Sequence, residues 1–433
     1  MFETFRNAWK IPDLRKKILF TLFIIIVFRV GSIIPVPFID TGALKTAMTG
    51  AAGGGGFFGY LSVFTGGAMD YGAVFAMGVS PYITASIIMQ LLQVAIPALG
   101  RLAKEGEEGQ KKIAKYSRFA TVILGLIQGT AFYFYLKNST LLLADATTGM
   151  FSTIFAAVVI VLCFTAGSAV VMWLGEQVDK SGIGNGISII LFAGIISRVP
   201  QGAAYLWELF VGARQYIQVI GALLIMLAVI VFIVFMTAAE RRIPVQYAKR
   251  VVGRKMYGGQ STHMPIKVNM SGVMPIIFAS SILAIPSTVT SFMGTGSANS
   301  TIYKLLSQLS FTSPAYTVLY LLFIIGFAYF YVTIQYDPIE MANNLRKNSG
   351  AVPGIRPGKP TSEYIKKILG RVTLIGALFL GVIAVLPTIV GAIGNIPLTL
   401  GGTSVLIVVG VAQETVQQIE SQMLMRHYKG FLE

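Results

Sequence analysis

Charged residues are scarce in this chain of 433 residues, which is 55% hydrophobic and only 12% charged. A soluble domain carries about 25% charged residues, and the mean hydropathy here is +0.72. These values exclude a soluble globular protein and indicate an integral membrane protein. The apolar residues form long continuous segments, whereas the strands of an outer-membrane barrel alternate in polarity over about ten residues. We therefore expect an all-α membrane protein.

Cysteine and histidine are almost absent as well. Cys163 is the single cysteine, so an internal disulfide is excluded, and its apolar sequence neighbours indicate an inert packing residue. The two histidines, His263 and His427, lie in or near polar segments far apart in the sequence. We expect no metal site and no cofactor.

The motifs of nucleotide and metalloenzyme chemistry are missing from the sequence. It contains neither a G-x-x-x-x-G-K-[ST] phosphate loop nor an H-E-x-x-H helix. The glycine string at residues 182–186 follows no strand and opens an apolar segment, so it indicates a tight turn between spans. Paired carboxylates are absent too, so we do not expect an enzyme. Energy for any directed transport would have to come from a partner.

Ionisable groups are nearly absent from the apolar segments. Ion-coupled transporters and pumps need buried acidic, histidine or arginine side chains to carry the coupling. Arg29 is the clear candidate here, and an Arg at the centre of a span costs about 2.5–3.5 kcal/mol unless a partner or snorkelling offsets it. We interpret Arg29 as a structural anchor. A secondary transporter of small solutes is the weaker alternative to a passive channel.

The apolar segments themselves are numerous, and each has the length of about 20 residues that a membrane span needs. They predict ten transmembrane helices, at 18–37, 71–97, 118–137, 151–174, 184–200, 215–238, 268–290, 315–336, 368–388 and 403–423. With the N-terminus in the cytoplasm, most of the 34 Lys and Arg fall in cytoplasmic tails and loops, as the positive-inside rule requires. Both termini are then cytoplasmic. The basic start and the apolar run after it form a retained first span rather than a signal peptide.

One stretch of sequence occurs twice. Residues 78–88 recur almost intact at 272–282, and each copy carries a Gly and a Pro that weaken a helix. Interrupted helices at matching places in two halves point to a transport site at the repeat interface. The copies lie in the second and seventh expected spans, which cross the membrane in opposite directions. The sequence thus predicts two inverted five-helix halves, residues 1–200 and 201–433.

The polar side chains of these two spans and the third are uncharged hydroxyls and amides. Such groups contribute about 0.6 kcal/mol each at a helix interface. They would hold a seam that can open, or they would serve ordinary interhelical packing, and the residues alone leave both readings open. The side chains are Thr84, Ser86, Gln90, Gln93, Gln128, Asn269, Ser280 and Ser281.

Three long connections stand out between the spans. The first contains an apolar piece at 57–67, bounded by glycines and too short to span. It is either a re-entrant stopper in a pore or a loop on the outer surface. The other two, 239–267 and 337–367, are basic and well beyond ordinary loop lengths. They would contact anionic lipid or dock a negatively charged cytoplasmic partner, and their length together with their charge favours docking.

Several ordered segments are those of a known family. They are Ile26-Val-Phe-Arg-Val-Gly31, Pro81-Tyr-Ile-Thr-Ala-Ser-Ile87, Trp173-Leu-Gly-Glu-Gln177, Lys267-Val-Asn-Met-Ser-Gly272, Pro353-Gly-Ile-Arg-Pro-Gly358 and Gly401-Gly-Thr-Ser-Val-Leu-Ile407. With them the chain resembles the SecY/Sec61α protein-conducting channels over essentially its whole length. The resemblance implies an hourglass pore with a lateral gate between spans two and seven. It further implies passage of unfolded, signal-bearing polypeptides across the bacterial plasma membrane and lateral insertion of membrane helices.

The resemblance also implies the residues of the channel. The aliphatic pore ring, which blocks ions by dewetting, maps onto Val79, Ile83, Ile187, Leu191, Ile277 and Ile407. The family prefers isoleucine there, so Val79 and Leu191 depart slightly but stay aliphatic. The plug maps onto Gly59, Tyr60, Leu61, Ser62, Val63, Phe64, Thr65, Gly66 and Gly67. The lateral gate maps onto Thr84, Ser86, Ile87, Gln90, Gln128, Asn269, Ser280 and Ser281.

The same resemblance implies partners. The two basic connections correspond to docking sites for the SecA ATPase and the ribosome, at Arg241, Arg242, Lys249, Arg250, Arg254, Lys255, Arg346, Lys347 and Arg356. Arg356 is the residue we expect to matter most for motor-driven transport. The implied companions are the SecE and SecG subunits, signal peptides and nascent polypeptides, and anionic lipids. Nucleic acid is implied only as ribosomal RNA.

Overall fold

The computed structural model describes residues 6, 8–49, 62, 64–144, 149–212, 216–247, 250–252, 255–257, 261–293, 313–394 and 402–429. The chain divides into two compact units. Unit 1 is made of Met1–Gln215, Ser281–Tyr316 and Ile407–Glu433, and unit 2 of Tyr216–Ser280 and Thr317–Leu406. The predicted division of the sequence into halves at residue 200 stays a prediction.

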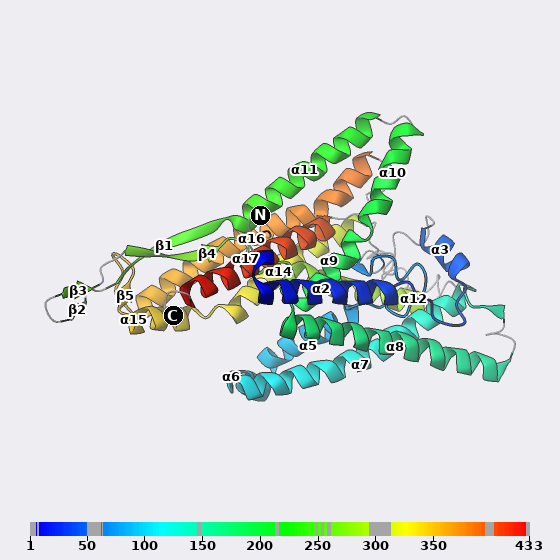
Figure 1. The fold of residues 1–433 in the computed structure, drawn as a ribbon, viewed down its shortest axis with the longest axis horizontal. Coiled ribbons are helices and arrows are strands. Elements are labelled where there is room, and N and C mark those ends of the chain that lie inside the picture. Colours follow the sequence, from blue (N-terminus) through cyan, green and yellow to red (C-terminus); the bar gives the residue numbers. More distant parts are fainter. Residues whose placement is uncertain are drawn as a thin grey trace. The chain divides into compact units, whose positions relative to one another are not determined.

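Unit 1 is built of helices. They are α2 (Pro12–Gly31), α3 (Thr41–Thr49), α5 (Ser80–Ala95), α6 (Pro97–Lys104), α7 (Glu107–Asn138), α8 (Met150–Ser181), α9 (Gly186–Ile196), α10 (Val199–Val211), the later part of α12 (Met274–Met293) and most of α17 (Gly402–Lys429). α7 packs along both α5 and α8 (Figure 1). This three-helix layer supports the segment that connects α3 to α5.

The core of unit 1 lies between α7, α8 and that connecting segment. Phe132 on α7 and Phe164 on α8 are fully buried and meet edge to face, with ring centroids 5.3 Å apart. The two helices also lie close together at Gly125, where a Cβ would be in ordinary contact with Thr165 Cγ2 at 3.4 Å. Met69 and Met77 belong to the same buried cluster. The connecting segment is therefore part of the core rather than a surface loop.

Unit 2 combines long apolar helices with a small sheet. Its helices are α11 (Tyr216–Ala238), the start of α12 (Met274–Met293), most of α14 (Pro314–Gln335), α15 (Pro338–Lys347) and α16 (Lys359–Gly394). Aromatic rings join them: Phe232 on α11 meets Phe379 on α16 with centroids 5.3 Å apart. Phe278 on α12 meets Phe327 on α14 at 5.8 Å.

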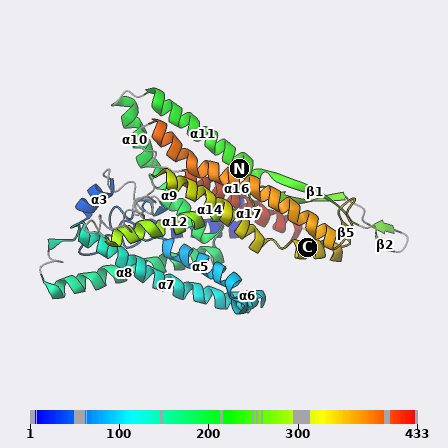
Figure 2. The ribbon, with the colours of Figure 1, turned by 180° about the vertical axis from the view of Figure 1, so that it is seen from behind.

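Strands in unit 2 correct the prediction of an all-α protein, since the fold is mostly helical with two small sheets. β1 (Glu240–Tyr247) lies between β4 (Ser261–Lys267) and β5 (Gly350–Ala351), and β2 (Arg250–Val252) pairs with β3 (Lys255–Tyr257). Figure 2 shows β1 running on from α11 towards β5. Ile243 and Val245 alternate with exposed neighbours and bury on one face. This alternation is the sequence signal of a half-buried strand, and the overall hydropathy of the chain obscured it.

Six helices in the described ranges are long and apolar enough to cross a membrane. They are Glu107–Asn138, Met150–Ser181, Gly186–Val211, Tyr216–Ala238, Ala315–Lys347 and Lys359–Leu386. A seventh candidate is the pair α5 and α6, bent by 108° at its break. The helix α2, in the predicted span at 18–37, is not among these candidates, and it carries the basic residues Arg15, Lys16, Lys17 and Arg29. The full set of ten spans stays a prediction.

The repeated motif begins a helix in both copies instead of interrupting one. Gly78 has φ 53° and Gly272 has φ 60°, a left-handed conformation that favours glycine. α5 starts at Ser80 and α12 at Met274, each with a proline in its first turn, where a missing N–H costs nothing. The predicted span at 71–97 is therefore wrong in its first part, because residues 65–79 form turns.

Candidate functional site

The segment before α5, which we call the turn segment (residues 64–79), is fixed by short-range hydrogen bonds and by burial. The amide N–H of Gly67 donates to Ser62 O at 2.9 Å, and that of Ala73 donates to Ala68 O at 2.9 Å. The amide N–H of Val74 donates to Ile34 O at 2.9 Å, which ties the segment to the chain just after α2. The described part of this segment is therefore packed against unit 1, while a re-entrant stopper at 57–67 stays a prediction.

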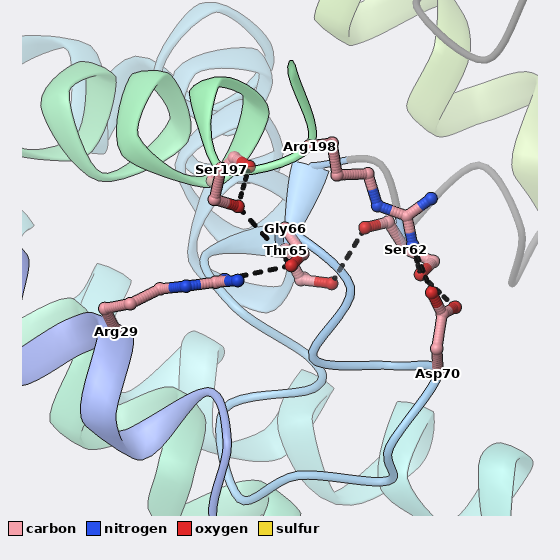
Figure 3. Close-up of polar contacts among 8 residues, drawn as sticks. Arg29, Ser62, Thr65, Gly66, Asp70, Ser197 and Arg198 are labelled. Atoms are coloured by element: carbon pink, nitrogen blue, oxygen red, sulfur yellow. Dashed lines mark hydrogen bonds and ion pairs between the residues drawn. The ribbon is translucent and has the colours of Figure 1, made fainter. Parts of the chain in front are cut away.

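A polar network joins the turn segment to two other parts of unit 1 (Figure 3). Arg29 on α2 donates from Nη1 to the carbonyl oxygen of Gly66 at 2.9 Å. The Ser197 hydroxyl, from the junction of α9 and α10, reaches the same oxygen at 3.4 Å and Gly194 O at 2.6 Å. One backbone carbonyl is therefore held from two sides.

The second half of the network is ionic. Arg198 Nη2 donates to Ser62 Oγ at 2.6 Å and forms an ion pair with Asp70 Oδ2. The Ser62 hydroxyl donates to the other oxygen of Asp70, so the three side chains close a ring of contacts. The side chains of Arg198 and Asp70 are only 16% and 15% exposed. Removing one partner of such a pair leaves an uncompensated buried charge, which costs about 3–5 kcal/mol.

Two glycines, Gly194 and Gly66, allow α9 and the residues after it to lie close to the turn segment. A Cβ at Gly194 would lie 2.2 Å from Phe64 O, and one at Gly66 would lie 2.3 Å from Ser197 Oγ. Gly66 also has φ 66°. Both glycines are therefore required by backbone contact between α9 and the turn segment.

We expect Gly194→Ala to destabilise the protein by about 1–3 kcal/mol, because its methyl group meets a backbone oxygen that cannot rotate away. The measurement is the thermal unfolding midpoint of the purified protein in detergent. The matched control is Gly221→Ala in α11, where a Cβ meets nothing within 4 Å and alanine should be neutral or stabilising. Equal midpoints for Gly194→Ala and wild type would contradict the observed seating of the turn segment.

Arg29 is the anchor that its sequence position predicted, and its partner is a backbone carbonyl. Ser197 and Arg198 were not among the predicted site residues. A signal did exist, since Arg198 ends one expected span and the opposite charge Asp70 begins another, close to the glycine-bounded apolar piece. Nothing in the sequence indicated that these two span ends meet.

The predicted pore-ring residues lie on four helices or their starts. Val79 precedes α5 and Ile83 is in its first turns, Ile187 and Leu191 are about one turn apart on α9, and Ile407 lies on α17; all five belong to unit 1. Ile277 lies on α12 within unit 2. Their assembly into one ring stays a prediction.

The predicted gate residues use their polar groups in two ways. The hydroxyls of Thr84 and Ser280 donate to carbonyls of their own helices, Ser80 O and Ile277 O, both at 3.0 Å. The buried oxygens of Gln128 and Asn269 have no hydrogen-bond partner within the described residues. Ser86, Ile87 and Gln90 lie on α5 and Ser281 on α12. A seam between α5 and α12 stays a prediction.

The two basic connections meet in one sheet of unit 2, which was not foreseen. Arg241 and Arg242 lie on β1 opposite Ile266 and Pro265 of β4, and Tyr247 pairs with Gly350 of β5. Arg346 and Lys347 end α15 directly before β5, while Arg250 and Lys255 lie on β2 and β3. The predicted docking residues Lys249 and Arg254, and the predicted plug residues Gly59, Tyr60, Leu61 and Val63, lie outside the described residues.

Arg356 lies in a turn that its neighbours define. Val352 is buried at 4% exposure, whereas the Arg356 side chain is exposed. Gly354 and Gly358 have φ 81° and 107°, and Thr361 Oγ1 donates to Arg356 O at 2.9 Å. The backbone is therefore held independently of the guanidinium group.

The glycine string at 182–186 forms the predicted turn, between α8 and α9. Asn185 caps α9 by accepting from Ser188 N at 3.1 Å, and Gly186 N donates to Asp179 Oδ1 at 2.7 Å. The amide N–H of Ile183 donates to Thr21 Oγ1 of α2 at 3.1 Å. These amides are occupied by protein groups, as expected for a structural turn.

Known proteins similar to this chain share both its sequence and its fold. A profile of the family described as SecY matches residues 73–416. A protein translocase subunit SecY from Streptomyces galbus is 46% identical over 448 residues, covering 100% of both chains. A solved structure described as that of a protein conducting channel has a TM-score of 0.65 at 20% identity, covering 94% of this chain and 92% of the other. Sec61 in the canine ribosome-channel complex from the endoplasmic reticulum has a TM-score of 0.59 at 19% identity, covering 94% and 92%. From the profile match and the identity over its whole length, this chain belongs to the SecY family.

Proposed function

We propose that the chain is the channel subunit of a protein translocase, a passive pore for unfolded, signal-bearing polypeptides. The observation that carries this proposal is its 46% identity to a protein translocase subunit SecY over the full length of both chains. The scarcity of ionisable residues in the expected spans agrees with a passive pore. Passage would then be driven by a partner.

The proposed channel has ten spans in two inverted halves, with a lateral gate between α5 and α12. The support is local: the two copies of the repeat begin their helices with the same glycine conformation and a proline in the first turn. The aliphatic ring of Val79, Ile83, Ile187, Leu191, Ile277 and Ile407 would seal the idle pore by dewetting. Opening the gate would let membrane helices pass into the bilayer.

The proposed plug is the glycine-bounded piece that ends in the turn segment. Its described residues, Ser62 and Phe64 to Gly67, are tied to α2 and to the α9–α10 junction. Irregular backbone at membrane depth survives only when it is buried in protein or lines a cavity. A segment that is held in place and whose backbone forms turns at residues 65–67 fits a stopper.

The proposed docking platform for SecA or the ribosome is the sheet β4–β1–β5 with α15. One buried hydrophobic cluster joins the sheet to α15, and it includes Ile243, Val245, Leu345 and Val352. The exposed arginines of β1 and α15 are therefore carried by elements that pack against each other. A ribosome is named for the structurally similar canine Sec61 complex. Companion subunits SecE and SecG, anionic lipid and a bacterial plasma-membrane location with cytoplasmic termini complete the proposal.

Reconstitution tests the function. Vesicles that contain the purified chain with SecE, SecG and SecA should protect an unfolded polypeptide with a signal sequence from external protease when ATP is added. The matched control is the same polypeptide without its signal, which should stay accessible. Ion-coupled uptake of small solutes by the chain alone, with no protection of the polypeptide, would overturn the channel proposal.

A further inference from the structure

We propose that the Asp70–Arg198 ion pair is a latch that sets how readily the idle channel opens, a role that rests on the proposed channel function. Arg198 and Asp70 are 128 positions apart in sequence, yet their side chains form an ion pair. One comes from the junction of α9 and α10, and the other from the turn segment that leads into α5. The pair therefore joins the turn segment that precedes the proposed gate helix to the junction of α9 and α10.

The burial of the pair decides its strength. Both side chains are about five-sixths buried, and Coulomb attraction at a given distance grows as the effective dielectric constant falls. Ser62, at 1% exposure, donates to Asp70 and accepts from Arg198. The last part of the proposed plug is thus gripped by the same two charges.

The ion pair would act as a switch, because the attraction between its two charges depends on whether water reaches them. While the region is dry, the attraction between the two charges is strong, and each charge holds the other in place. Once the turn segment shifts and water enters, the attraction is screened and both charges are solvated separately. The first displacement weakens the restraint on the next, so opening is cooperative. An apolar contact would loosen gradually instead.

Loss of the ion pair should leave the turn segment folded, because other contacts hold this segment without the side chains of Asp70 and Arg198. Arg29 and Ser197 hold the backbone carbonyl of Gly66, and Ala68, Met69 and Ala76 remain buried at 0% exposure. The pair is therefore a positioning device for the turn segment, and its role can be separated from the fold.

The experiment measures leakage and signal dependence of the reconstituted complex. Vesicles loaded with potassium chloride would carry wild type, Asp70→Asn, Arg198→Gln or the double variant, without substrate. Each single variant should raise potassium efflux about tenfold or more, equivalent to about 1.4 kcal/mol of lost closed-state preference. Each should also admit a polypeptide with a defective signal. The double variant should leak no more than the worse single variant, since one interaction has been removed.

Two controls make the outcome specific. Glu176→Gln breaks another ion pair of unit 1, the one that Glu176 forms with Arg118 at 2.6 Å. This ion pair lies near the other end of α9, so its loss should leave efflux unchanged. Asp70→Glu keeps the charge and should stay close to wild type, which a purely steric role of Asp70 would not give. Wild-type efflux and unchanged signal dependence in both single variants would overturn the latch.

A second variant covers the case in which the single substitutions do not fold. In Asp70→Cys/Arg198→Cys, a bifunctional thiol crosslinker replaces the ionic contact by a covalent one. It should suppress both efflux and translocation, and its cleavage should restore them. Translocation with the crosslink complete would contradict the proposal. If wild type itself does not translocate the signal-bearing polypeptide, the proposed channel function is wrong. If wild type translocates it and the variants show the same efflux and signal dependence as wild type, only the proposed latch is wrong.

Discussion

A disulfide between cysteines at positions 86 and 281 should abolish translocation until it is reduced. Ser86 lies in the middle of α5, and Ser281 lies on α12, one residue after Ser280, which matches Ser86 in the second copy of the repeat. If a polypeptide passes through a pore that widens between these helices, they must separate. A disulfide holds its two Cβ atoms about 3.8 Å apart, which is far less than an extended chain needs. The expected effect is therefore complete loss of transport.

The measurement is ATP-driven protection of a signal-bearing polypeptide before and after addition of a reductant. Cys163 should first be changed to Ser, because it is the free thiol of the chain and only partly buried. The matched control is Gly125→Cys/Thr165→Cys, because a Cβ at position 125 would lie 3.9 Å from Thr165 Cβ. That disulfide joins α7 to α8 within one packed layer and should leave transport intact. Full transport with the 86–281 crosslink complete would refute the gate assignment.

Charge reversal at Arg356 should have the second-largest effect, a severe loss of motor-driven transport in a protein that still folds. The Arg356 side chain is exposed, and its turn is held by the burial of Val352 and by left-handed glycines at 354 and 358. Arginines at the centre of an interface cost about 2 kcal/mol or more when lost, which is roughly a thirtyfold change in affinity. Arg356→Glu also adds repulsion from an acidic partner surface.

Two measurements separate docking from folding in this variant. SecA binding to the reconstituted complex should weaken at least about thirtyfold, whereas the unfolding midpoint in detergent should stay at the wild-type value. Lys359→Glu is the matched control, since it makes the same change in net charge at an exposed site close by. Equal losses in both variants would show that overall charge, and not Arg356, governs docking.

Features that depend on local sequence were predicted well. The glycine string at 182–186 was identified as a turn, because a turn depends on chemistry visible within a few residues. Arg29 was expected to be an anchor from its charge within an apolar segment, but its partner, the carbonyl of Gly66, lies 37 positions away. The repeated motif was found correctly but interpreted wrongly, as an interruption. Its Gly and Pro begin α5 and α12, and a left-handed glycine followed by a first-turn proline is a start signal as much as a break.

Features that depend on distant pairing were missed. In the strand β1, Ile243 and Val245 alternate with exposed residues, yet its partner β5 comes from the other basic connection, about a hundred residues away. Arg198 and Asp70 were visible as charges at span ends, but neither has a local partner. In both cases the residues can be found in the sequence, but the sequence does not indicate which distant segment each of them contacts.

By itself, the sequence determined that this protein is a mostly helical membrane protein with a doubled motif and few coupling residues, because hydropathy, charge bias and repetition are properties summed along the chain. Only the tertiary structure decided that the turn segment is buried, that the carbonyl of Gly66 is held by Arg29 of α2 and by Ser197 of the α9–α10 junction, and that Asp70 meets Arg198. Those facts depend on which surfaces pack together, and packing is selected by the whole chain at once.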